Sequence, residues 1–99
     1  MPTLVRGGAL RRQAWPPWWD WELELTAHLT ERMSDRSFTE IDLRSMLEAT
    51  ASLGRDAEPG CWRATTRHLG RRWVVVVTPD PSRSRLVVIT AYPLESRPW

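Results

Sequence analysis

Cysteine is almost absent from this sequence, and long hydrophobic runs are missing altogether. The single cysteine, Cys61, cannot close a disulfide within the chain. No stretch approaches the roughly 18 apolar residues that cross a bilayer, and the arginine-containing N-terminus has no sustained apolar segment of the kind found in a signal peptide. We therefore expect a cytoplasmic protein with no membrane partner.

Recognisable metal and nucleotide motifs are missing as well. The side chains of His28, Cys61 and His68 have neither the CxxC nor the HxxxH spacing of metal ligands. The glycine-rich phosphate loop that ends in Gly-Lys-Ser or Gly-Lys-Thr does not occur. The sequence therefore predicts no metal site and no cofactor.

Lysine does not occur, so all 14 basic residues are arginines. Their distribution is uneven: residues 20–58 contain ten acidic residues and four arginines, whereas residues 59–99 contain seven arginines and two acidic residues. Such an asymmetry can mark a face that binds anions, or it can let the two halves of the chain attract each other.

The length of 99 residues fits one domain with a single modest core. We expect an N-terminal arm over residues 1–19, where paired glycines and paired prolines interrupt any periodicity, one domain over residues 20–95, and a tail over residues 96–99. The arm carries Trp15, Trp18 and Trp19, which either cover an edge of the core or contact a partner, and we favour core cover.

The first half of the domain predicts a short edge strand and two helices. Apolar residues alternate with acidic ones over residues 20–25, which indicates a strand. Thr26 can then cap a helix over residues 27–35. Residues 39–42 have the form of a capping box and predict a second helix that ends near Gly54.

The second half predicts three strands, because "CWRATTR", "WVVVVT" and "RLVVITAY" are rich in β-branched and aromatic residues and are separated by short polar links. Residues 73–77 are apolar on both faces and indicate the central strand. The predicted fold is α+β, a two-helix hairpin packed on a small antiparallel sheet of three to four strands in the order β-α-α-β-β-β.

Two rows of side chains are candidates for binding an anion. His28, Arg32 and Arg36 recur every four residues and share one side of the first helix, although pairs such as Arg32 with Asp35 would make that side an ordinary solvated surface. In the strand that follows the acidic turn, Arg63 and Arg67 share a face with Cys61 and Thr65, while Trp62, Ala64, Thr66 and His68 occupy the other face. A polyanion could bind the arginine face, since nucleic-acid affinity comes largely from phosphate contacts.

The last strand carries a tyrosine and a threonine near its end. Uninterrupted alternation places Thr90 and Tyr92 on the same face as Leu86 and Val88. Tyr92 then either packs with its hydroxyl in water or serves as an acid or phosphate ligand.

The block "LTAHLTERMSDRSFTEIDLRSML", together with "GCWRATTRH", "WVVVVTPD" and "LVVITAYP", resembles the bacterial family of domains of unknown function numbered 4258. The resemblance covers roughly residues 20–95, and its most specific parts are the His-x3-Arg-Met-x2-Arg run and the Thr-Ala-Tyr-Pro sequence. That family is in turn similar to the RelE-like fold of barnase, EndoU and colicin ribonucleases, in which helices pack on an antiparallel sheet.

The resemblance implies a metal-independent ribonuclease of the toxin type, which needs a base, an acid and cations around the phosphate. The catalytic residues it suggests are His28, Arg32, Arg63 and Tyr92, and the substrate-binding residues are Arg36, Arg67, His68 and Thr90. Fold similarity alone carries an activity only by association. The alternative is a non-catalytic module that binds RNA or a protein partner, such as an antitoxin, through the basic sheet face and the tryptophan-rich arm. A homodimer is a third possibility.

Overall fold

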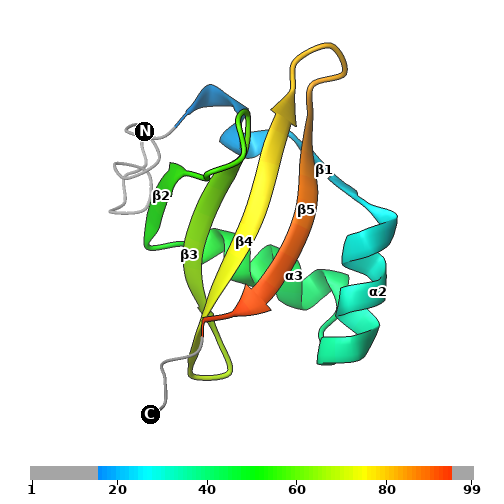
Figure 1. Cartoon of the computed structure of the whole chain (residues 1–99), viewed down its shortest axis with the longest axis vertical. Coiled ribbons are helices and arrows are strands. Elements are labelled where there is room, and N and C mark those ends of the chain that lie inside the picture. The colour runs from blue at the N-terminus through cyan, green and yellow to red at the C-terminus, as the bar shows by residue number, and fades with distance from the viewer. Residues whose placement is uncertain (1–15, 95–99) are drawn as a thin grey trace, which may run out of the picture.

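The computed structural model describes residues 16–94, which form a five-stranded sheet and two α-helices (Figure 1). The elements are η1 (Pro17–Asp20), β1 (Glu22–Leu25), α2 (Ala27–Arg36), α3 (Glu40–Glu48), β2 (Ser52–Arg55), β3 (Trp62–His68), β4 (Arg71–Asp80) and β5 (Arg85–Pro93). The α+β class predicted from the sequence is confirmed. Within residues 16–94, no helix is long and apolar enough to cross a membrane.

The strands lie in the order β1-β5-β4-β3-β2, so β4 is the central strand, as predicted. Strands β2 to β5 are antiparallel to their neighbours, but β1 runs parallel to β5. The prediction of a purely antiparallel sheet with three to four strands is therefore wrong in strand number and in the direction of β1. The two short strands β1 and β2 form the two edges.

Strand β2 replaces the last turn of the predicted second helix. Helix α3 ends at Glu48, and Gly54 pairs with Arg63 in the sheet and does not terminate the helix. Thr50, two residues after the helix, is fully buried, and its hydroxyl donates to the carbonyl of Met46 (3.2 Å). The chain is then free to pair with β3.

Both predicted helix starts are confirmed. The Thr26 hydroxyl oxygen accepts the Leu29 N–H (3.0 Å) at the start of α2. At the start of α3, the Thr39 hydroxyl oxygen accepts the Asp42 N–H and the Asp42 carboxylate accepts the Thr39 N–H, which completes the capping box. These local signals therefore position both helices correctly.

The two helices lie against different strands. Helix α3 crosses one side of the sheet and packs against β3, whereas α2 lies beside β5 (Figure 1). The core fills the space between the sheet and the helices, and it is built from Leu29, Phe38, Leu43, Met46, Leu47, Ala64, Trp73, Val75, Val77, Leu86, Val88 and Ala91. The opposite side of the sheet carries no helix of the described chain, and we call it the open face.

Part of the predicted N-terminal arm belongs to the folded domain. Trp19 in η1 is 9% exposed and joins the core, and the Trp18 ring lies 5.4 Å from the Trp62 ring. Residues 1–15, which include Trp15, and residues 95–99 lie outside the described residues.

A β-bulge interrupts the alternation of β5. Val77 pairs with Val88, but Val76 pairs with Thr90, so Ile89 is an extra residue without a partner in β4. Leu86, Val88 and Ala91 consequently face the helices, and Thr90 and Tyr92 face away. The prediction that Thr90 and Tyr92 share the face of Leu86 and Val88 is wrong, because a bulge reverses the facing of every residue beyond it.

Thr26 fixes the position of this bulge. Its N–H donates to the Val88 carbonyl (3.3 Å), and its hydroxyl donates to the carbonyl of the bulged Ile89 (3.1 Å). The same hydroxyl oxygen caps α2. One side chain therefore joins the end of β1, the start of α2 and the bulge in β5.

Candidate functional site

The open face gathers polar and cationic side chains from three neighbouring strands. Strand β3 contributes Arg63, Thr65 and Arg67, strand β4 contributes Arg72, Val74 and Val76, and strand β5 contributes Thr90 and Tyr92. The facing predicted for the arginines of β3 is confirmed, because β3 alternates without interruption. Tyr92 joins them because of the bulge.

Arg63 and Tyr92 make contact across the central strand. The Arg63 Nη2 lies 3.4 Å from the Tyr92 hydroxyl oxygen, although β4 separates their two strands. The pair passes over Val74 and Val76, which are 1% and 7% exposed despite lying on the face without helices. Because the tyrosine oxygen accepts from the guanidinium, its own O–H can be donated to another group.

The charge of Arg63 is only partly neutralised. The Arg63 Nε lies 3.6 Å from a carboxylate oxygen of Asp56, and the arginine side chain stays 44% exposed. An exposed ion pair at this distance contributes little stability. Arg63 can therefore turn donors toward a phosphate while keeping its contact with Asp56.

Arg67 and Arg72 lie directly opposite each other on β3 and β4. Like charges in this arrangement repel, which destabilises a strand pair. Neither side chain has a carboxylate partner among residues 16–94. An anion bound between the two guanidinium groups would remove the repulsion.

A shallow depression of about 330 Å³ lies beside Arg63 and Arg72. Its far wall is the edge strand β2, and its near end is closed by Leu94, whose N–H donates to the carbonyl of Arg72 (2.7 Å). The lining residues are Ser52, Leu53, Gly54, Arg55, Arg63, Thr65, Arg72, Val74 and Leu94. Among residues 16–94, the wall of the depression contains arginines and small hydroxyl side chains but no carboxylate.

The row on α2 does not join the arginines of the sheet through any polar contact among residues 16–94. Arg32 pairs with Asp35 (2.8 Å), which is the solvated-surface alternative considered above. His28 is exposed in the first turn of the helix. Arg36 donates to the carbonyl of Ala91 (3.2 Å), the residue before Tyr92, so it has a structural role at the end of β5.

His68 lies on the other side of the sheet from Arg63 and Tyr92. Its ring packs edge-on against Trp73, with the centroids 5.4 Å apart, and lies 6.4 Å from the Phe38 ring. Strand parity puts it there, since Arg67 next to it faces the open side. The structure therefore does not bring His68 together with Arg63 and Tyr92, and its substrate-binding role stays a prediction.

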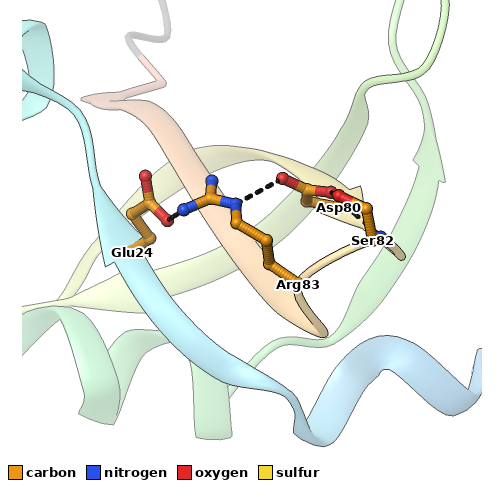
Figure 2. Close-up of polar contacts among 4 residues, drawn as sticks. All are labelled: Glu24, Asp80, Ser82 and Arg83. Atoms are coloured by element: carbon orange, nitrogen blue, oxygen red, sulfur yellow. Dashed lines mark hydrogen bonds and ion pairs between the residues drawn. The ribbon is translucent and has the colours of Figure 1, made fainter.

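A second charged cluster holds the β4–β5 loop in place (Figure 2). Arg83 lies 2.9 Å from Glu24 on β1 and 2.9 Å from Asp80 at the end of β4, and the Asp80 carboxylate also accepts from Ser82. Hydrogen bonds from Ser82 and Arg83 lower the pKa of Asp80. The pKa of Arg83 is raised by its hydrogen bond to Glu24 and, to a smaller extent, by its hydrogen bond to Asp80. Sequence analysis missed this cluster, and the Asp-Pro-Ser turn is the signal that indicates it. Its charges are already paired, so it fits a structural role.

The remaining reactive groups and pockets of the domain are weaker candidates for a functional site than the open face. Burial, with the negative charges of Asp56 and Glu58, raises the pKa of the Cys61 thiol, which disfavours the reactive thiolate. A pocket of about 200 Å³ on the helix side lies between η1, β1 and α3, where Trp19, Trp21 and Leu47 contribute apolar walls. Among residues 16–94 no group of three or more metal-ligating side chains comes together.

Comparison with known proteins identifies one family. The family described as "Domain of unknown function (DUF4258)" matches residues 25–93, most of the folded part of the chain. No curated protein and no solved structure matches the chain.

Proposed function

Because the chain belongs to the DUF4258 family, whose description assigns no activity, we propose a function from the geometry of the open face: the domain binds RNA there. The observation that carries the proposal is the opposed pair Arg67 and Arg72, which has no carboxylate partner among the described residues and lies on the same face as Arg63 and Tyr92. Phosphate neutralisation by arginine supplies most of the affinity of such a surface.

The spacing of the arginines favours a chain of phosphates over a single small anion. Arg63 and Arg67 are four residues apart on β3, which is roughly 13 Å along an extended strand. Where the two side chains stand side by side away from the sheet, their guanidinium groups are separated by more than the width of one phosphate group. A polynucleotide that follows the strand can contact each in turn, with forked arginine donors matching the phosphate oxygens.

Tyr92 and the hydroxyls of Thr65 and Thr90 favour RNA over a featureless polyanion. An aromatic ring beside a basic groove is a platform on which an unpaired base can stack. Hydroxyl groups can pair with the ribose 2′-hydroxyl, the group that distinguishes RNA from DNA. The toxin-type ribonuclease resemblance of the sequence points to the same substrate class.

The proposal extends to metal-independent cleavage of the bound RNA by a RelE-like domain. A base takes the proton from the ribose 2′-hydroxyl, the 2′-oxygen attacks phosphorus, and the bond from phosphorus to the 5′-oxygen breaks. Arg63 stabilises the charged phosphate, and Tyr92 gives its proton to the leaving 5′-oxygen. The proposed base is His28, the residue that the family resemblance suggests, which lies on α2 without polar contact to this pair among residues 16–94. Arg32 and Arg36 beside it on α2 are proposed further phosphate contacts.

Binding is tested by fluorescence anisotropy with a labelled single-stranded RNA at several salt concentrations. Loss of one phosphate contact makes the plot of log affinity against log salt concentration less steep by about 0.7. We expect this change in each of Arg67→Gln and Arg72→Gln. Arg44→Gln is the matched control, because Arg44 is an exposed arginine on α3 that pairs with Glu40. Equal affinity and equal salt dependence in all four proteins would overturn the proposal and favour the alternative of a protein-binding module, with an antitoxin or a second copy of the chain as partner.

Cleavage is tested separately by incubating RNA with the protein and a chelator and looking for 2′,3′-cyclic phosphate ends. General acid and base groups each contribute about 10²- to 10⁴-fold to such reactions. Tyr92→Phe and His28→Ala should each lower the rate by that factor, whereas His68→Gln, which changes the histidine on the helix side, should not. If the wild type binds RNA and leaves it intact, the catalytic part of the proposal fails and the binding part stands.

A further inference from the structure

The turn between β3 and β4 holds a leucine in a conformation that leucine rarely adopts. Leu69 and Gly70 form a two-residue turn closed by the pair His68 and Arg71, and both turn residues have positive φ, 53° and 78°. Hairpins with this geometry favour Asn-Gly or Asp-Gly, because a larger side chain is strained in the left-handed region. Leu69 is therefore strained where a smaller polar residue would not be.

Burial does not compensate for this strain. The Leu69 side chain is 86% exposed, the highest exposure of any large hydrophobic residue that the structure describes. The turn projects beyond the end of β5, at the lower end of the sheet in Figure 1. Strained backbone conformations cluster at functional positions, so the strain that packing leaves uncompensated makes Leu69 a candidate for a role outside the folding of the domain.

The surroundings of Leu69 are basic. Residues 59–79 include four arginines and no acidic residue. Arg67 and Arg72, the opposed pair of the open face, lie two residues before the turn and two residues after it. The leucine thus stands at the tip of the ribbon whose arginines we propose to contact phosphates.

We propose that Leu69 is a wedge that inserts between stacked bases of the RNA held by Arg67 and Arg72. This inference rests on the proposed RNA binding and adds its mode: the ligand is a stacked strand or a duplex end, which the leucine partly unstacks. Nucleic-acid-binding proteins use apolar side chains in this way, flanked by cations that hold the backbone. The rigid two-residue turn fixes the position of the wedge, so little conformational freedom is lost on insertion.

The test uses an RNA that carries 2-aminopurine within a stacked run, because its fluorescence rises when it is unstacked. Wild-type protein should raise the fluorescence several-fold at saturation. Leu69→Asn, which suits the left-handed turn, should lose at least two thirds of this rise while the salt dependence of binding stays unchanged. Ile41→Asn is the matched control, since Ile41 is another exposed aliphatic residue (76%) and lies on α3.

The outcomes separate this inference from the proposed function. Binding by anisotropy without a rise in fluorescence, or an equal rise in wild type and Leu69→Asn, would overturn the wedge and leave RNA binding intact. Absence of binding in the wild type would remove the proposed function and the wedge with it. Thermal unfolding of Leu69→Asn, expected at or above the wild-type temperature, checks that a lost signal does not come from misfolding.

Discussion

The Arg63 guanidinium reaches across a whole strand to the Tyr92 hydroxyl, 3.4 Å away, on the face where the neighbouring Val74 and Val76 are buried. The contact needs both the regular alternation of β3 and the irregularity of β5. On this face, polar side chains take the place of a second layer of helices, since they shield apolar residues and leave their own donors facing water. A face built in this way can exchange water for phosphate without exposing the valines.

Replacing Tyr92 by phenylalanine removes the hydroxyl and keeps the ring, so the effects of the two groups can be measured separately. The ring should still cover Val74 and Val76, so we expect the free energy of unfolding to change by no more than about 0.5 kcal/mol, given that 3.4 Å is a long hydrogen bond. RNA affinity should fall by about tenfold or more, because a hydrogen bond to a charged group contributes about 1.5–3 kcal/mol. Urea unfolding and anisotropy measure the two effects, and a large loss of stability would contradict this account of the ring.

Replacing Thr26 by valine removes the cap of α2 and the hydrogen bond to the bulged Ile89 together. We expect a loss of about 2 kcal/mol, from about 1 kcal/mol for the cap and about 1 kcal/mol for the second bond. Thr26→Ser keeps both interactions and should lose much less. Thr30→Val is a further control, because the Thr30 hydroxyl bonds only to the backbone carbonyl of Thr26, one turn earlier. Urea titrations in which Thr26→Val equals Thr26→Ser would rule out this role.

Replacing Leu69 by asparagine should stabilise the domain. The substitution relieves a left-handed leucine and removes an apolar side chain that is almost fully exposed, so we expect a gain of about 0.5–1 kcal/mol. Chemical denaturation measures it. A clear loss of stability would mean that the leucine packs against another part of the domain and is not a free wedge.

The capping box of α3 should weaken in acid. The hydrogen bond from the Thr39 N–H lowers the pKa of Asp42, with smaller contributions from the Thr39 hydroxyl and the charge of His68. A carboxyl whose pKa is lower in the folded state stabilises the fold above its unfolded pKa, and this contribution disappears as the pH falls through the folded pKa. The stability difference between wild type and Asp42→Asn should therefore be present at neutral pH and should shrink below about pH 4. Unfolding curves at pH 7 and pH 3 test this, and a difference that does not depend on pH would contradict it.

Local signals in the sequence predict much of this fold and only part of the site. The caps at Thr26 and Thr39 depend on neighbouring residues, and the alternation of β3 is regular, so the helix starts and the facing of Arg63 were predicted correctly. The bulge in β5 could not be predicted in this way. Its sequence is a continuous run of apolar and β-branched residues from Leu86 to Ala91 with no glycine to mark an irregularity, and the residue that binds the bulged carbonyl is 63 positions away.

The end of the second helix likewise depends on contacts between residues that are distant in the sequence. Thr50 falls at helical spacing after Leu43 and Met46, and only the pairing of β2 with β3 ends the helix earlier. His68 and Arg63 were proposed for one function because of their chemistry, although the alternation of the strand in the sequence already places them on opposite faces. In contrast, the arginine opposite Arg67 could have been found by counting residues outward from the Leu69-Gly70 turn, which places Arg72 there.

Thr26 also determines which parts of the domain can open together. When the first turn of α2 unfolds, the hydrogen bond from the Thr26 hydroxyl to the Ile89 carbonyl breaks. The residues of β5 after the bulge then lose the contact that fixes which face of the sheet they occupy. Amide exchange in the first turn of α2 and in the Thr90–Tyr92 part of β5 should then share one opening free energy, distinct from that of the β3–β4 ribbon. The helix that carries His28 and the strand end that carries Tyr92 would respond to a bound ligand as one cooperative unit.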